Sequence, residues 1–518
     1  MKSSRLSASR HESDIVLIKQ VLILFVLCCA CAQTNALQLT ANDRLTLQAE
    51  SYIASRPIES TMTVLEVFNN YQRLQQRWVG QDNAGHNQIV IATNPLFAKT
   101  QLFNRQGLAE SNAKITFIRL NYITHALPNS PQNVSGLLIL PPTKSPKGII
   151  LFFHSTISGK LNVPSLHFED YKAQMLAAIF AANGYIVVSP DYIGLGRNFA
   201  IPHPYILYPR YNVLDGGDML VAAYEYLKTK KLLLPPGDKV KLPLFVSGYS
   251  EGASYALWFS RMYQSKPDFA QAVTQLGLKL HKTVPIDGTY NLSGVMFPFL
   301  LTSQVNNNSN LFQIQSSFWG SLLKPLLLTN VSLAFAYYNN RSISQLLNPD
   351  FFHRTCAVLP AKWCHSEQIL SENINDLLFT PSKTMTLVLK LFWAAILKSS
   401  GGVIYSPLFN SVAALMRDGA ANDQELLSQT VQADILNWQS RNPITLISLA
   451  HDSLVPEKNS ADAYHAMTRA KSTNLKYIKF ANSQLYARAL FGAEVVDHVS
   501  FELYALLIAL NEFEDSQP

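Results

Sequence analysis

The 518-residue sequence has few cysteines, few charged side chains and no clustered histidines. Three of its five cysteines, Cys28, Cys29 and Cys31, fall in one apolar run, so only Cys356 and Cys364 remain for the rest of the chain. We therefore expect no metal site. Charged residues make up 15% of the chain, and no stretch combines Lys and Arg with interleaved aromatic residues. This pattern predicts no nucleic-acid partner.

The sequence also lacks a clear membrane-spanning segment near its amino end. The run VLILFVLCCACA at 21–32 follows several basic residues and has the length of a signal-peptide core, but it is too short to cross a bilayer. The small-x-small pattern at 30–32 predicts cleavage there and a mature chain that begins at Gln33. We therefore expect a secreted or periplasmic protein. A buried helix and a lipoprotein acylated on Cys29 or Cys31 are the alternatives.

The two remaining cysteines, Cys356 and Cys364, form an even pair with seven residues between them. In a chain expected to be exported, such a pair favours a disulfide that closes a short loop. Two buried thiols are the alternative.

The most informative stretch is LPLFVSGYSEGASYALWFSR at 242–261. An apolar strand-like run leads into GYSEG, and small and aromatic residues at helical spacing follow. Such a turn holds Ser250 above a sheet on strained backbone, where a side chain at Gly248 or Gly252 would collide with neighbouring backbone. The pattern predicts a nucleophilic serine, with an ordinary Gly-Ser turn as the alternative.

Strand and helix patterns alternate along much of the chain. Strand patterns occur at KITFIRLNYITHAL, NVSGLLILPP and KGIILFFHST, and helices and apolar strands then follow one another on both sides of GYSEG. This alternation predicts parallel β-α-β units and a mostly parallel sheet covered on both faces. Partners for Ser250 should lie just beyond the carboxyl ends of the strands.

A catalytic serine needs a histidine to take its proton and an acid to orient that histidine. Asp452 follows the apolar strand pattern ITLISLA, and His498 follows the last strand pattern and opens the final helix. The chain order Ser250, Asp452, His498 is the one expected for a nucleophile on a strand-to-helix turn.

Other residues compete for these roles. Asp287 also ends a strand pattern and is the main alternative for the acid. His451 lies beside the predicted acid, and His465 lies within a helical pattern, where a solvated or packed histidine is expected. Both are weaker candidates for the base.

The tetrahedral intermediate of such a reaction needs preorganised hydrogen-bond donors. The amide of Glu251, directly after the nucleophile, is the first expected donor. The second should come from the loop His154-Ser155-Thr156. We favour the amide of Thr156, with Ser155 as the alternative, and a plain surface turn remains open.

Six short motifs carry a family resemblance: FFHST at 152–156, SPDYIGLG at 189–196, HPY at 203–205, GYSEG at 248–252, HDSLVP at 451–456 and DHVS at 497–500. Through them the chain resembles the α/β-hydrolases, and more narrowly the secretory lipase and carboxylesterase-type serine hydrolases with a helical cap. One departure is Ser155, since related enzymes often have Gly after the His of this loop.

The resemblance implies an α/β-hydrolase fold, with a mostly parallel eight-stranded sheet flanked by helices and a helical cap insertion. The expected organisation is a signal peptide at 1–32, an amino-terminal extension packing on the core at 33–112, hydrolase core at 113–288, the cap at 289–440 and the second part of the core at 441–518.

The interval between Asp287 and Pro443 is far longer than one crossover helix requires, which predicts an inserted subdomain. Its apolar runs are interrupted by Lys324, Pro325 and Lys390, so we expect no transmembrane span. Because it leaves the sheet at the carboxyl edge, the insertion should lie over Ser250, where some of its apolar residues can line a cavity. The alternative is that these apolar residues only form the core of the cap itself.

The resemblance implies ester hydrolysis through an acyl-enzyme, with no metal and no organic cofactor. A small-molecule or lipid ester is the expected substrate, with transient contact to a membrane or lipid surface, and the sequence leaves the oligomeric state open. A serine peptidase on the same fold is one alternative. A non-catalytic binding protein that kept the scaffold is another, but such proteins typically lose the serine or the histidine.

Overall fold

The computed structural model describes residues 57–79, 81–98, 113–128, 130–157, 159–232, 242–301, 318–347, 416, 419–452, 454–490 and 493–516. The predicted signal peptide, the start of the mature chain at Gln33 and the pair Cys356 and Cys364 lie outside these residues. None of the helices in the described ranges is long and apolar enough to cross a membrane.

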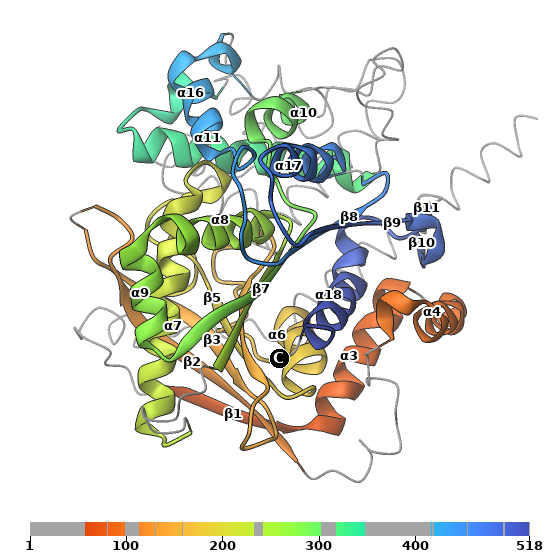
Figure 1. The fold of residues 1–518 in the computed structure, drawn as a ribbon. Helices are drawn as coiled ribbons and strands as arrows, with labels where there is room; N and C mark the ends of the chain where they lie inside the picture. Colours follow the sequence, from red (N-terminus) through yellow and green to blue (C-terminus); the bar gives the residue numbers. More distant parts are fainter. Residues whose placement is uncertain are drawn as a thin grey trace, which may run out of the picture.

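The centre of the molecule is a mostly parallel nine-stranded sheet (Figure 1). In chain order its strands are β1 (Ile58–Thr63), β2 (Lys114–Thr124), β3 (Gln132–Leu140), β4 (Gly148–Phe153), β5 (Tyr185–Pro190), β6 (Leu242–Tyr249), β7 (Leu278–Ile286), β8 (Ile444–Leu449) and β9 (Leu475–Phe480). Their spatial order is β1-β2-β3-β5-β4-β6-β7-β8-β9. The pairs β1–β2, β2–β3 and β3–β5 are antiparallel, and the rest are parallel.

The central strands follow directly from the sequence. Strands β4, β5 and β8 are buried at every residue. A strand in the middle of a parallel sheet has helices on both faces, so it needs a nearly continuous apolar run rather than alternation. Strand β2, nearer the antiparallel edge, alternates between buried and partly exposed positions.

Two groups of helices cover the sheet. The helices in chain order are α3 (Val64–Val79), α4 (Gln81–Thr93), α6 (Tyr171–Leu176), α7 (Pro209–Thr229), α8 (Glu251–Ser265), α9 (Pro267–Gln275), α10 (Phe297–Leu301), α11 (Phe318–Tyr338), α16 (Gln424–Ala433), α17 (Lys458–Arg469) and α18 (His498–Glu514). Helices α3, α4, α6 and α18 share one apolar core with the sheet, and α7, α8, α9 and α17 share the other.

Helix α18 is the most deeply buried of the sheet helices. Every residue from Phe501 to Phe513 in it is buried, including Glu502 and Glu512. The carboxylate of Glu512 is neutralised by Lys282 at 2.7 Å and accepts a hydrogen bond from Thr445. Because this helix is enclosed on all sides, it has no polar face toward solvent, and its buried charged side chains are paired.

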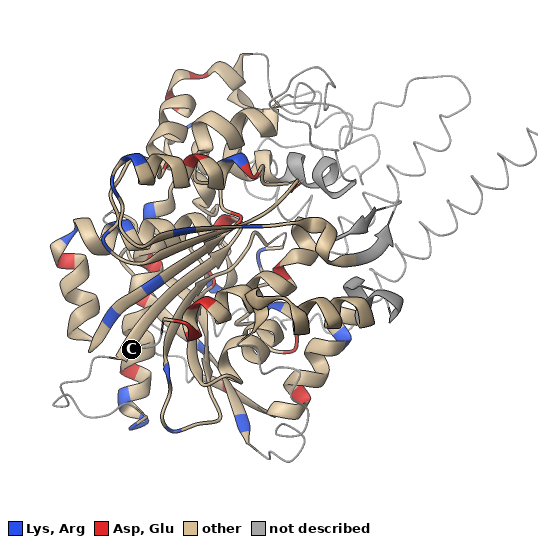
Figure 2. Ribbon diagram, turned by 45° about the vertical axis from the view of Figure 1, so that its right-hand side comes forward, with Lys and Arg blue, Asp and Glu red and all other residues tan. Residues whose placement is uncertain are grey.

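Helices α10, α11 and α16, which belong to the predicted insertion, gather with α17 at one end of the sheet (Figure 1). They form a third apolar cluster, which also contains residues 205–207 and Val455 from the core. Lys and Arg are dispersed over many helices, strands and loops (Figure 2).

Two elements differ from the sequence expectation. The sheet has nine strands instead of eight, because residues 58–63 form β1 along the edge of β2. Residues 486–495, expected to be a loop, contain the antiparallel pair β10 (Tyr486–Leu490) and β11 (Ala493–Val495). Strand β1 was not predicted because none of its residues is buried and it has no apolar alternation, so its partner strand determines its conformation.

Candidate active site

Ser250 lies on a sharp turn between β6 and α8. Its backbone has φ 55° and ψ −117°, a conformation that L-residues rarely adopt and that is typical of strained functional turns. A Cβ on Gly248 would lie 2.3 Å from the carbonyl oxygen of Gly252, and one on Gly252 would lie 2.0 Å from that of Phe153. The close approach predicted from the GYSEG pattern is therefore present, and only glycine fits at both positions.

His498 is placed by a helix cap. It is the first residue of α18, which begins with a capping box. Asp497 Oδ1 accepts hydrogen bonds from the amides of Val499 and Ser500, and Ser500 Oγ accepts one from the amide of Asp497. This reciprocal pair determines where the helix starts and hence the position of the imidazole.

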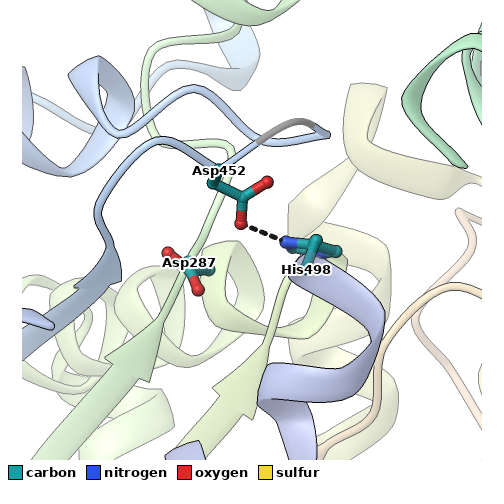
Figure 3. A group of neighbouring side chains, drawn as sticks. All are labelled: Asp287, Asp452 and His498. Atoms are coloured by element: carbon teal, nitrogen blue, oxygen red, sulfur yellow. Dashed lines mark hydrogen bonds and ion pairs between the residues drawn. The ribbon is translucent and has the colours of Figure 1, made fainter. Parts of the chain in front are cut away.

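Asp452 holds the imidazole of His498. His498 Nδ1 lies 2.6 Å from Asp452 Oδ2, and both side chains are buried (Figure 3). The other carboxylate oxygen, Oδ1, accepts hydrogen bonds from the amides of Leu454 and Val455 at 2.7 and 2.9 Å. Burial alone lowers the pKa of His498, but the Asp452 carboxylate and its hydrogen bond outweigh burial and raise that pKa above its usual value.

Asp287, the competing acid, has a different partner. Its Oδ1 accepts the amide of Leu449 at 2.7 Å, and its Oδ2 is buried with no hydrogen-bond partner among the described residues. Figure 3 shows it beside Asp452 with no bond to His498. Burial, together with the charge of Asp452, raises the pKa of Asp287 well above its usual value. The geometry thus favours Asp452 over Asp287 as the orienting acid.

A cavity of about 200 Å³ lies at the turn. Ser250 and His498 both line it, as do the residues predicted for the oxyanion hole: Ser155, Thr156 and Glu251. Ser250 Oγ makes no hydrogen bond to His498 in this structure, and the side chain of His498 is bonded through Nδ1. Catalytic hydrogen bonds are often long without substrate and shorten when it binds, so this geometry is compatible with proton transfer.

The rest of the cavity wall is largely apolar. Ile206, Leu454 and Val455 come from the core, and Met296 and Leu327 come from the insertion. The described part of the insertion therefore contributes to the same cavity as Ser250. Apolar walls around a few polar groups are typical of a site for an organic molecule.

One wall of the cavity contains a buried ion pair that the sequence did not predict. Ser155 Oγ donates to Glu502 Oε1 at 2.9 Å, and Lys172 Nζ bonds to both Ser155 Oγ and Glu502. Glu502 lies four residues after His498, on the same side of α18. The hydroxyl of Ser155 is thus bonded within this pair, which accounts for a polar side chain where related enzymes often have glycine.

Comparison with known proteins identifies the fold. No family model matches the sequence, and no curated protein matches it significantly. A rice cell wall degrading esterase from Xanthomonas oryzae matches with a TM-score of 0.58 and 19% identity, over 80% of this chain and 95% of that one. A putative hydrolase from Legionella pneumophila matches with a TM-score of 0.58 and 16% identity, over 89% and 98%. The chain has the α/β-hydrolase fold.

The fold expected from the six motifs is therefore confirmed. At identities of 16–19% the similarity concerns the fold alone. Since one fold can carry many functions, the function of this α/β-hydrolase fold depends on the residues that line its cavity.

Asp287, Asp452 and His498 also offer ligand atoms within 4.8 Å of one another, a spacing that could suit a cation. Within this α/β-hydrolase fold, however, His498 Nδ1 is bonded to Asp452, and Asp287 accepts the amide of Leu449. The group is better explained as an imidazole hydrogen-bonded to one carboxylate, with a second carboxyl group beside it.

Proposed function

We propose that the chain is a serine hydrolase that cleaves carboxylic esters through an acyl-enzyme. Ser250 would be the nucleophile and His498 the general base and acid. Asp452 would hold the tautomer of His498 and stabilise its charged form. The observation that carries the proposal is that Ser250, on its strained turn, shares one cavity with an imidazole whose other nitrogen is bonded to a buried carboxylate.

The oxyanion would be held by backbone amides. The amide of Glu251 follows the nucleophile, and the amide of Thr156 is the favoured second donor, with Ser155 as the alternative. All three residues line the cavity. Support for an ester rather than another acyl compound comes from the esterase named among the solved structures with this fold.

The proposed substrate has a medium-length or longer acyl chain. Ile206, Met296, Leu327, Leu454 and Val455 present apolar surface around Ser250. Each methylene buried there contributes about 0.8 kcal/mol, which is roughly fourfold in kcat/KM while the chain still fits.

A series of chromogenic nitrophenyl esters from acetate upward, measured with the wild-type protein and Ser250→Ala, tests the proposal. We expect kcat/KM to rise from acetate to a medium-chain optimum. Ser250→Ala should lower kcat by about 10⁶-fold, and only the wild type should be labelled by a fluorophosphonate. Unchanged turnover in Ser250→Ala would refute the serine mechanism. An acetate optimum would refute the acyl preference, and faster cleavage of matched anilides would favour the peptidase.

The proposal includes export after signal-peptide cleavage and a disulfide between Cys356 and Cys364. The lipoprotein and the two free thiols remain the alternatives. Both features lie outside the described residues and rest on the sequence alone.

A further inference from the structure

Glu251, the residue after the candidate nucleophile, has a buried side chain that is surrounded by hydrogen-bond donors. Its Oε1 lies 2.6 Å from His203 Nε2 and accepts the hydroxyl of Tyr255 at 2.8 Å. Its Oε2 accepts the hydroxyl of Thr156 at 2.8 Å. Burial alone raises the pKa of Glu251, but the charge and hydrogen bond of His203 outweigh burial and lower it. With three donor groups on its two oxygens, the carboxylate has the hydrogen bonds that its ionised form requires.

The partner of this carboxylate is also fully bonded. His203 Nε2 faces Glu251, and His203 Nδ1 lies 2.7 Å from the carbonyl oxygen of Ile193. A carbonyl and a carboxylate can only accept hydrogen bonds, so both ring nitrogens carry a proton. The ring also stacks on Tyr192, at 5.4 Å between centroids and 8° between planes. His203 is thus a fixed cation that neutralises Glu251.

The ionised carboxylate determines the direction of the neighbouring hydrogen bonds. Because Glu251 can only accept, the hydroxyl of Thr156 must donate to it. The contact of 3.2 Å between Thr156 Oγ1 and the hydroxyl of Tyr205 must then run from Tyr205 to Thr156. The result is an ordered chain from Tyr205 through Thr156 to Glu251, and it leaves the Thr156 hydroxyl without a proton to donate to substrate.

This chain joins the two parts of the candidate oxyanion hole. Thr156 belongs to the loop after β4, and Glu251 is the first residue of α8, so their separation is not fixed by any one element. We propose that the Glu251 side chain, neutralised by His203, is the positioning group of the oxyanion hole. It ties Thr156 to the residue whose own amide is the first donor. This inference rests on the proposed function, since the oxyanion belongs to that reaction.

Because His203 balances the charge of Glu251, the proposal predicts a specific pattern of kcat losses among variants of these two residues. His203→Gln keeps a hydrogen-bond donor but leaves Glu251 as an unneutralised carboxylate beside the developing oxyanion. This variant should lower kcat by about 10²-fold, with KM changed by less than about threefold. Glu251→Gln removes the charge and loosens Thr156, which should cost about 10-fold. The double variant should recover to within about threefold of Glu251→Gln, because no unneutralised charge remains.

The experiment measures kcat and KM on one nitrophenyl ester for these three variants, the wild type and Ser250→Ala. His465→Gln, in which an exposed histidine of α17 is replaced, is the matched control and should behave as the wild type. Thr156→Val and Thr156→Ser avoid any new buried charge. Thr156→Val should lose about 10-fold in kcat, and Thr156→Ser should retain nearly full activity.

The outcomes separate the two proposals. If Ser250→Ala is inactive and the loss in His203→Gln is relieved by Glu251→Gln, the inference is supported. If Ser250→Ala is inactive but the two losses simply multiply, or Thr156→Val is as active as Thr156→Ser, the positioning role is wrong and the serine mechanism stands. If Ser250→Ala turns over ester as the wild type does, both proposals are wrong.

Discussion

Two buried histidine–carboxylate pairs each contribute one residue to the wall of the cavity at Ser250, and they look alike. In each, a ring nitrogen lies 2.6 Å from a carboxylate oxygen: His498 from Asp452 and His203 from Glu251. They differ in the second ring nitrogen. That of His203 is bonded to a backbone carbonyl, whereas His498 lines the cavity and its side chain is bonded through Nδ1 alone.

The difference shows that a short histidine–carboxylate contact does not by itself indicate catalysis. A proton can be taken from substrate only by a nitrogen that has a lone pair and access to the reacting atom. His203 has no free lone pair and no access to a reacting atom, so its pair with Glu251 can only balance charge and position neighbouring groups. His498 lines the same cavity as Ser250, so under the proposed mechanism its second ring nitrogen, when neutral, would take the proton of Ser250.

The largest expected effect comes from breaking the pair of His498. Asp452→Asn should lower kcat by about 10³ to 10⁴-fold with the fold intact, because the amide no longer stabilises the imidazolium or fixes its tautomer. Asp287→Asn is the matched control and should change kcat little, since Asp287 is bonded to the amide of Leu449 instead of His498. Steady-state kinetics with circular dichroism checks both. If Asp287→Asn lowered kcat more than Asp452→Asn did, Asp287 would be the orienting acid.

A smaller effect is expected in the pH dependence. The raised pKa of His498 means that its neutral form, and hence kcat/KM, should increase as pH rises through a value above 6.5. In Asp452→Asn, the rise of the residual kcat/KM with pH should shift to lower pH by about one unit or more, because the carboxylate charge that raises the pKa of His498 is gone. If kcat/KM of the wild type rose through a pKa at or below 6.5, this account would be contradicted.

The contribution of His498 to folding stability should change with pH in the direction opposite to kcat/KM. Since the folded-state pKa of His498 is raised, its charged form stabilises the fold fully below the unfolded value near 6.5. This contribution is lost as pH rises through the folded pKa. Activity therefore increases over the pH range in which this contribution to stability decreases.

The smallest effect concerns chemical access. His203 and His498 are about equally buried, at 7% and 4% exposed, so exposure does not distinguish them. Diethyl pyrocarbonate should slowly modify His498 and leave His203 unmodified, because only His498 has a nitrogen without a hydrogen-bond partner. Peptide mass mapping, with exposed His465 as the reference, measures both. Prior phosphonylation of Ser250 should protect His498, and modification of His203 at a similar rate would contradict the comparison.

The sequence predicted the parts of this molecule that local patterns determine. Buried strands such as β4 and β8 are apolar throughout, and the turn at Ser250 requires glycine at two fixed positions. The structure brings Ser250 and His498 to one cavity, with Asp452 bonded to His498. Their catalytic roles remain a prediction.

The sequence could not predict contacts that depend on distant segments. Strand β1 has no buried residue and is defined by its pairing with β2. The ion pair of Lys172 and Glu502 joins α6 to α18 and was not predicted. The position of Glu502, four residues after His498, is the one sequence signal that would have suggested a role for it at the site. The role of the Glu251 side chain depends on His203, which lies 48 residues earlier.

Helix α18 contributes both to the core and to the candidate site. Its first residue is His498, and its remaining length is enclosed against the sheet. On a ribosome the turn with Ser250 emerges well before this helix, so the proposed nucleophile is made without its base. Under the proposed mechanism, the chain would gain activity only when α18 docks, late in folding. The appearance of activity during refolding would therefore report completion of the fold, and not formation of the turn.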